Sequence, residues 1–299
     1  MERHSLADHV ERQLQPVDRL SGPVEAAVSV ARELGLRVDE PVVLRDLTNV
    51  LVRLDPSPVV ARVPRTLTRL RGRDWFALEL RVVAWLARAG APVSAPTTLI
   101  DPGPHERDGF LISFMEAVDH DDGRSDAAAA GRALRELHRA LVDCPEELPD
   151  FRRLDETRAL LDVLHPSDLV SQYEIDGMRE VVTLLGKSPP PLLRPIHGDS
   201  HLGNVLWSPR GPLWTDFENV CAGPVEYDLA CISWRGRPQD KGALEAYGPH
   251  DERLRESMEP YVALFLAPWT VTIVERHPSP GGIEEARRRI SRALEPLAR

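Results

Sequence analysis

The residues best suited to chemistry lie between positions 197 and 218 of this 299-residue chain. One segment reads His197-Gly-Asp-Ser-His-Leu-Gly-Asn204, and Asp216-Phe-Glu218 follows it. Mg²⁺ prefers oxygen ligands and takes one or two protein side chains, with water and phosphate completing its shell. A carboxylate beside such a metal, here Asp199, can accept the proton of an attacking hydroxyl. These residue types at these intervals indicate phosphoryl transfer.

A β-hairpin is predicted to bring the two parts of this segment together. Two short apolar runs, 204–207 and 213–217, are joined by the turn sequence Ser-Pro-Arg-Gly. With that turn as the loop, Asn204 lies opposite Thr215 or Asp216. An asparagine and an aspartate therefore meet at the open end of a two-stranded ribbon, which is the donor set of a magnesium site.

The order of these residues is similar to that of known kinases. The protein-kinase catalytic loop has the same Asp-x4-Asn spacing, followed by a metal-binding aspartate. Together with Glu226-Tyr-Asp-Leu-Ala230, these motifs resemble the aminoglycoside phosphotransferase and choline kinase-like family. The resemblance is strong over about residues 194–231. Over about residues 41–141 it is weaker and lies in the order of the predicted helices and strands. The resemblance implies a bilobal, protein-kinase-like fold that uses ATP and Mg²⁺ to phosphorylate the hydroxyl of a small molecule.

The resemblance also implies a role for each motif residue. Asp199 is the catalytic base, and His197 stabilises its loop. Asn204 and Asp216 are the Mg²⁺ ligands, and Asp228 anchors the loop from behind.

The residues predicted to bind the nucleotide depart from the usual kinase pattern. A kinase-like N-lobe places a cation on a strand and pairs it with a glutamate on the next helix. Arg62 occupies that strand position, and Glu79 is the expected partner. The lysines are Lys187 and Lys241, so no lysine precedes residue 187. Arginine binds phosphate with a planar fork and is not interchangeable with lysine. The alternative is that Arg62 is a solvated residue on an edge strand.

Three further residues are predicted to contact the nucleotide. The loop from 47 to 50 contains no glycine, so contacts to phosphate would rely on Thr48 and Asn49. Met115 ends the strand that leads into the inter-lobe hinge, where an adenine would bond backbone groups. ATP is the expected nucleotide, with GTP as the alternative.

The hydrophobic pattern predicts an α+β protein with a small antiparallel-sheet N-lobe and a mostly helical C-lobe. The expected domains are a nucleotide-binding lobe, 1–115, and a catalytic and substrate-binding lobe, 116–299. Strands are predicted at 41–47, 49–54, 59–63, 97–100 and 109–115. Helices are predicted at 24–34, 74–89 with Asp74 as its N-cap, 127–142, 155–164, 175–185, 251–266 and 282–297.

The composition excludes several classes of partner. The chain carries 47 acidic and 37 basic residues, a net charge of −10, which disfavours nucleic acid. Its 3 cysteines show no zinc-ligand spacing and no disulfide framework. The sequence shows no signal-peptide pattern and no long apolar run, so a cytoplasmic protein with no membrane partner is expected.

The charge is distributed unevenly, and this favours one class of acceptor. Residues 1–115 hold 15 acidic and 15 basic residues, so the whole excess of acid lies in 116–299. Asp119, Glu218 and Glu226 are the predicted acceptor-binding residues. A cationic acceptor such as an aminoglycoside or amino sugar is preferred, which would make antibiotic resistance the role. The alternatives are a neutral sugar, amino acid or choline-like metabolite, or a nucleotide-binding pseudokinase. The oligomeric state is unknown from the sequence.

Overall fold

The protein is described here by a computed structural model that covers residues 21–46, 48–64, 71–150, 154–187, 192–234 and 238–298. These residues form two compact units. The sheet unit contains the described parts of Arg12–Glu147 and Gly203–Glu218, and the helical unit those of Leu148–Leu202 and Asn219–Arg299. The domains predicted from the sequence, 1–115 and 116–299, divide the chain differently because α4 (Ala127–Val142) packs with α3 and β8 of the sheet unit. That division stays a prediction.

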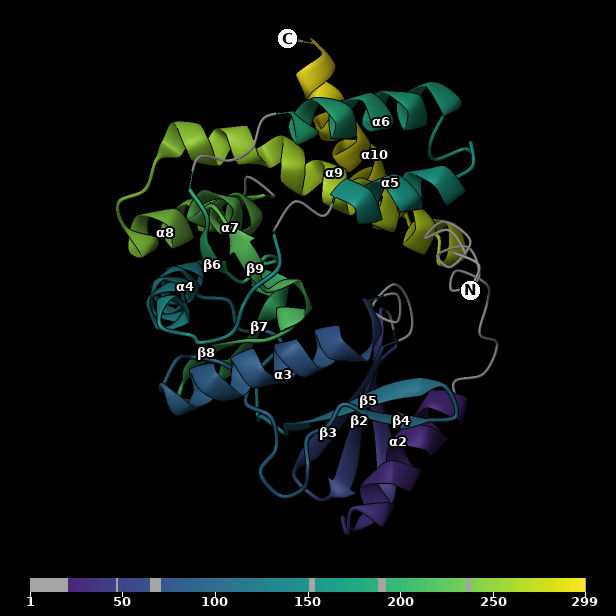
Figure 1. Cartoon of the computed structure of the whole chain (residues 1–299), viewed down its shortest axis with the longest axis vertical. Helices are drawn as coiled ribbons and strands as arrows, with labels where there is room; N and C mark the ends of the chain where they lie inside the picture. The colour runs from purple at the N-terminus through teal and green to yellow at the C-terminus, as the bar shows by residue number, and fades with distance from the viewer. Residues whose placement is uncertain are drawn as a thin grey trace. The chain divides into compact units, whose positions relative to one another are not determined.

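The sheet unit is built on an antiparallel sheet of order β1-β2-β3-β5-β4 (Figure 1). Its strands are β1 (Val38–Asp46), β2 (Asn49–Pro56), β3 (Val59–Pro64), β4 (His105–Arg107) and β5 (Phe110–Glu116). They confirm the α+β class and four of the predicted strands, although Leu47 at the end of the first lies outside the described residues.

The strand predicted at 97–100 is wrong. This segment forms bends, and its neighbour Pro96 makes an isolated bridge to Met115. The Thr97 hydroxyl accepts a hydrogen bond from the Leu99 backbone N–H at 3.3 Å, a local turn that competes with sheet pairing. The edge position beside β5 is taken by β4 instead.

Strand alternation decides which way the side chains of β3 point. Helix α2 (Ser21–Glu33) shares a hydrophobic cluster with β2 and β3 and covers one face of the sheet. Val59, Ala61 and Val63 belong to that cluster. Because successive side chains of a strand point to opposite faces, Arg62 points to the other face.

That other face meets α3 (Gly72–Arg88) through an ion pair between Arg62 and Glu79. The buried residues of α3 recur at helical spacing, and Glu79 lies among them next to Phe76 and Leu80. A carboxylate on a buried helix face requires a partner, and Arg62 supplies it. The predicted N-cap, Asp74, is wrong: the cap residue is Arg71, and Asp74 lies in the first turn.

The predicted hairpin is present as β7 (Val205–Ser208) and β8 (Gly211–Trp214). Trp207 pairs with Pro212, and Ser208 with Gly211. The turn is therefore two residues long. Trp214 also bonds the backbone of Pro92 and Ser94, which attaches the hairpin to the segment after α3.

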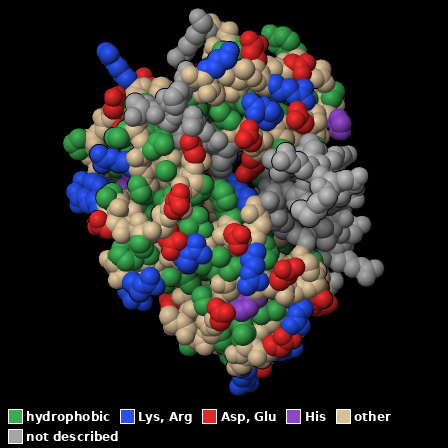
Figure 2. All heavy atoms as spheres, viewed as in Figure 1, with side chains coloured by type: hydrophobic (Ala, Val, Ile, Leu, Met, Phe, Trp, Pro, Cys, Tyr) green, Lys and Arg blue, Asp and Glu red, His purple; other side chains and the backbone are tan. Residues whose placement is uncertain are grey.

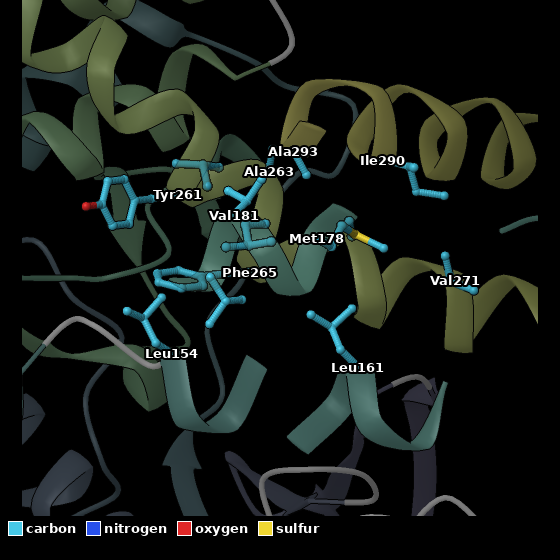
Figure 3. Packing of buried hydrophobic residues seen from close by; sticks show 14 of the residues in the cluster. Leu154, Leu161, Met178, Val181, Tyr261, Ala263, Phe265, Val271, Ile290 and Ala293 are labelled. Atoms are coloured by element: carbon cyan, nitrogen blue, oxygen red, sulfur yellow. The ribbon is translucent and has the colours of Figure 1, made fainter. Parts of the chain in front are cut away.

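The helical unit has one hydrophobic core, part of which is shown in Figure 3. Leu154 and Leu161 of α5 and Met178 and Val181 of α6 belong to this core, and the other residues labelled in Figure 3 come from α9 and α10. The helices are α5 (Leu154–Val163), α6 (Gln172–Gly186), α7 (Val225–Ser233), α8 (Pro238–Tyr247), α9 (Glu252–Arg276) and α10 (Pro280–Leu294). Two short strands, β6 (Arg194–Ile196) and β9 (Cys221–Gly223), pair beside them.

Helix α9 is longer than predicted and continues through Pro260 and Pro268. Among the described helices it is the one long and apolar enough to cross a membrane. Most of its apolar window is buried, and residues from Met258 to Val274 belong to the core of the helical unit. Burial of this kind is what a core helix of a folded domain shows.

Candidate functional site

The loop that carries Asp199 is held by a buried carboxylate beneath it. Asp228, in the first turn of α7, has no exposed surface. Its carboxylate accepts hydrogen bonds from the backbone N–H groups of His197 at 2.8 Å and Gly198 at 2.9 Å. Its backbone carbonyl accepts from the Ser200 hydroxyl at 2.7 Å. Asp228 therefore lies behind the loop, as predicted, and holds it at three points.

The same loop leaves the Asp199 carboxylate accessible. His197 is fully buried, and its ring Nδ1 accepts from the Asp199 backbone N–H at 3.2 Å. The Asp199 side chain is 19% exposed, and its Oδ2 lies 3.9 Å from His201 Nε2. A partly exposed carboxylate on a firmly held backbone is suited to accept a proton.

Gly198 is required by the shape of this loop. Its φ is +81°, and a Cβ there would lie 2.0 Å from the Asn219 carbonyl oxygen. Both the backbone conformation and the space exclude a side chain.

We expect Gly198→Ala to lower the free energy of unfolding by more than about 2 kcal/mol, because it adds left-handed strain to a backbone clash. Urea unfolding followed by fluorescence measures the loss. Gly211→Ala is the matched control, since Gly211 also has a positive φ, +127°, but nothing within 4 Å of its Cβ. Equal losses in the two variants would show that the Asn219 contact is unimportant.

The predicted metal ligands lie at the end of the hairpin in the sheet unit. The Thr215 backbone N–H donates to the Asn204 carbonyl at 2.9 Å, which extends the β7–β8 ladder by one pair. Asp216 follows with φ +64°, a left-handed conformation that is uncommon outside glycine and occurs at functional sites.

This donor set fits Mg²⁺. An amide and a carboxylate supply oxygen, and magnesium commonly completes its octahedron with water and nucleotide phosphates. Among the described residues no group of three or more His, Cys, Asp or Glu side chains could hold a metal by itself.

Arg62 connects three carboxylates. Its Nη1 donates to both oxygens of Glu79 at 2.6 and 2.7 Å. Its Nη2 donates to Asp216 Oδ1 at 3.1 Å and to Glu218 Oε2 at 2.6 Å. The alternative of a solvated edge-strand arginine is wrong, because β3 lies between β2 and β5 and Arg62 is buried.

Burial and the neighbouring charges together shift the pKa values of Arg62 and Glu79. Burial opposes the charge of the guanidinium, but Glu79, Asp216 and Glu218 together raise the pKa of Arg62. Burial also raises the pKa of Glu79. The charge and hydrogen bonds of Arg62 lower this pKa, but by less than burial raises it. The arginine therefore stays charged, and the ionised form of Glu79 depends on it.

Arg71 and Trp75, which the sequence analysis did not predict as site residues, hold the segment that contains Glu218. The Glu218 carbonyl accepts hydrogen bonds from Arg71 Nη1 at 2.5 Å and from Trp75 Nε1 at 2.6 Å. The Arg71 guanidinium lies 4.8 Å from the centroid of the Trp75 ring. Arg71 and Trp75 are four residues apart at the start of α3, and residues at this spacing share one helix face. This spacing is the feature of the sequence that could have predicted their common role.

The predicted nucleotide contacts are spread along the sheet. Asn49 is 5% exposed, and its Oδ1 is buried with no hydrogen-bond partner in the described part of the chain. Such an atom carries a desolvation cost that a ligand donor would relieve. Thr48 precedes it, and Met115 pairs with Val60 near the end of β5. Their roles in nucleotide binding stay predictions.

The predicted acceptor-binding acids are divided between the two units. Asp119 is exposed in the loop after β5, in the sheet unit, whereas Glu226 lies in the first turn of α7, in the helical unit. The Glu218 carboxylate binds Arg62. On the face drawn in Figure 2, the described acidic and basic side chains are interspersed. Acceptor binding by these three acids stays a prediction.

Comparisons by sequence support a phosphotransferase. A family model described as the phosphotransferase enzyme family matches residues 43–261. Stress response kinase A of Escherichia coli strain K12 is 31% identical over 136 residues. That match covers 45% of this chain and 39% of the relative, so the chain spans about two fifths of the length of the curated relatives it matches.

Comparisons by structure show a similar fold. A choline/ethanolamine kinase family protein from Mesorhizobium loti has a TM-score of 0.60 at 19% identity, with 99% of this chain and 96% of that chain covered. An amicoumacin kinase solved with AMP-PNP and Ca²⁺ has a TM-score of 0.67 at 13% identity, covering 90% and 92% of the two chains. At these identities the likeness shows the fold alone.

Proposed function

The chain belongs to the phosphotransferase enzyme family, and from this premise we propose that it is an ATP- and Mg²⁺-dependent kinase of a small-molecule hydroxyl. The observation that carries the proposal is the Arg62 group. A buried cation on β3 binds a glutamate on α3 with one nitrogen and the predicted metal aspartate with the other. A strand cation paired with a glutamate on the next helix is the part of this group that kinase-like sites use to position nucleotide phosphates.

Each residue of the site has a defined task in this proposal. Asp199 accepts the proton of the acceptor hydroxyl as that oxygen attacks the γ-phosphorus and the bond from this phosphorus to the β-phosphate oxygen breaks, which releases ADP. Asp228 keeps the Asp199 loop in place. Asn204 and Asp216 hold the metal, which when bound neutralises charge on the phosphates. Arg62 binds phosphate oxygens while Glu79 and α3 fix its direction.

We propose the chemical class of the acceptor from the distribution of charged residues along the sequence. The excess of acidic residues in 116–299 favours a cationic acceptor such as an aminoglycoside or amino sugar, which would make antibiotic resistance the role and the cytoplasm the location. A neutral sugar, an amino acid or a choline-like metabolite is the alternative. The names of the structural relatives, a choline/ethanolamine kinase family protein and an amicoumacin kinase, support acceptors that differ widely.

A turnover assay with the full chain tests the proposal. ATP or GTP is supplied with Mg²⁺ and a panel of aminoglycosides, amino sugars, neutral sugars, hydroxy amino acids and choline. We expect acceptor-dependent release of nucleoside diphosphate, its loss with EDTA, and its recovery when Mg²⁺ is added back. Nucleotide binding with no phosphorylation of any acceptor would instead support the pseudokinase alternative.

A further inference from the structure

The backbone and the carboxylate of Glu218 are held by different partners, all of them in the sheet unit. The backbone carbonyl accepts hydrogen bonds from Arg71 and Trp75 at the start of α3. The carboxylate, on a side chain that is 17% exposed, accepts from Arg62 Nη2 at 2.6 Å. Helix α3 therefore fixes the Glu218 backbone independently of Arg62, and the carboxylate is presented to the arginine from a held position.

The Arg62 guanidinium requires more than one carboxylate to fix its direction. Glu79 binds Nη1 alone, with both of its oxygens. A lysine at this position would present one nitrogen, which one glutamate can hold. An arginine presents a rigid fork of five N–H donors, and burial makes each unbonded donor costly. Nη2 of this buried side chain therefore needs an acceptor of its own.

Two carboxylates accept hydrogen bonds from Nη2, and they are not equivalent. Glu218 Oε2 lies at 2.6 Å, whereas Asp216 Oδ1 lies at 3.1 Å. Asp216 is also the predicted metal ligand, so its oxygens have a second task in the proposed function. Glu218 is the acceptor that can hold Nη2 whether or not Asp216 binds a metal.

On the basis of the proposed function, we propose that Glu218 is a positioning residue for nucleotide binding. Glu79 holds one nitrogen of the Arg62 fork and Glu218 holds the other, so the guanidinium meets the nucleotide phosphates in one orientation. The second glutamate compensates for the presence of arginine where kinase-like sites carry lysine. This task differs from the acceptor binding that the sequence predicts for Glu218, and the two roles give different results on mutation.

Removal of the carboxylate tests the inference. We expect Glu218→Ala to raise the Kd for ATP by about 10- to 100-fold, the effect of losing a hydrogen bond between charged groups. Glu218→Gln keeps an oxygen acceptor without the charge and is expected to lie between this variant and the wild-type protein. The KM for the acceptor is expected to stay unchanged. Titration with a fluorescent ATP analogue and steady-state kinetics measure these quantities.

The control is Glu146→Gln, which removes a charge that also pairs with an arginine of α3. Glu146 accepts from Arg81 Nε at 2.8 Å, and the Arg81 side chain is 54% exposed. This variant is expected to keep the wild-type Kd for ATP. Circular dichroism and thermal unfolding establish that each variant is folded. The Glu218 backbone contacts to Arg71 and Trp75 do not involve the carboxylate, so the segment should keep its place.

A titration with and without metal separates positioning of Arg62 from direct metal binding. The fluorescent analogue is added in the presence of Mg²⁺ and again in EDTA. We expect Glu218→Ala to weaken binding by a similar factor in both conditions, because its effect passes through Arg62. A loss confined to the Mg²⁺ condition would assign Glu218 to the metal and overturn the inference. A raised KM for the acceptor with an unchanged Kd for ATP would assign it to the acceptor and also overturn it.

A double-mutant cycle tests whether the requirement for Glu218 depends on the arginine. In Arg62→Lys the side chain presents a single nitrogen, which Glu79 alone can hold. We expect Glu218→Ala to raise the Kd for ATP by less than about threefold in this background, because no second nitrogen remains to be held. An equal loss in both backgrounds overturns the inference.

The binding measurements also distinguish failure of this inference from failure of the proposed function. An unchanged Kd in Glu218→Ala and Glu218→Gln, with acceptor turnover present, overturns the role of Glu218 alone. Nucleotide binding without turnover of any acceptor overturns the proposed function, and the titrations still decide the role of Glu218. Absence of nucleotide binding by the wild-type protein overturns both.

Discussion

Replacing Asp199 by asparagine is expected to lower kcat for acceptor phosphorylation by about 10²- to 10⁴-fold, the usual contribution of a positioned general base. The amide has the size of the carboxylate but cannot accept the hydroxyl proton. The loop should persist, because the backbone of His197 and Gly198 is held by Asp228. The KM for ATP is therefore expected to stay close to the wild-type value. Steady-state kinetics with the best acceptor from the panel measures both quantities.

The control for this prediction is Asp155→Asn. Asp155 is 94% exposed in the first turn of α5 and pairs with Arg158, so its loss should leave kcat unchanged. An Asp199→Asn protein with wild-type kcat would remove Asp199 from the role of base. A parallel loss of kcat and thermal stability would point to structural damage instead.

Replacing Arg62 by methionine is expected to lower the free energy of unfolding by about 3–5 kcal/mol, the cost of removing one partner from a buried ion pair. The remaining carboxylates of Glu79, Asp216 and Glu218 would repel one another with no cation between them. Nucleotide affinity should fall with stability, because the same guanidinium is the proposed phosphate ligand. Urea unfolding and titration with a fluorescent ATP analogue measure the two effects.

Two companion variants make this prediction specific. Arg62→Lys keeps a charge but a single nitrogen cannot reproduce the fork that reaches three carboxylates, so a smaller loss is expected. Arg53→Met, on the adjacent strand β2, breaks an exposed pair with Asp55 and should cost no more than about 1 kcal/mol. If Arg62→Met were as stable as Arg53→Met, the buried group would contribute nothing to folding.

Much of the fold could be read from local patterns. The hairpin was predicted because two apolar runs flank a Ser-Pro-Arg-Gly turn, and its pairing follows from the turn length. Helix α4 was predicted with its bounds because its apolar residues recur at helical spacing, and the structure shows that Asp126 caps it. The strand predicted at 97–100 failed because the chain turns after Thr97, whose backbone N–H still bonds Phe114, and the Leu99 N–H bonds the Thr97 hydroxyl instead of a strand. Helix α7 was read as a motif rather than a helix, since it is buried almost all round.

The sequence by itself determined which chemistry this protein has available. Asp199, Asn204 and Asp216 are close in the chain, and their order and spacing are enough to predict phosphoryl transfer. The absence of lysine before residue 187 likewise made Arg62 the predicted cation of the nucleotide-binding residues.

Only the tertiary structure decided what each charge binds. Arg62 binds Asp216 and Glu218, which are 154 and 156 positions away in the sequence. Arg71 binds Glu218, which is 147 positions away. Local patterns carry no information about such contacts, because a charged side chain is stable at many exposed positions. The partner becomes determined when packing removes the side chain from water and leaves one neighbour able to compensate its charge.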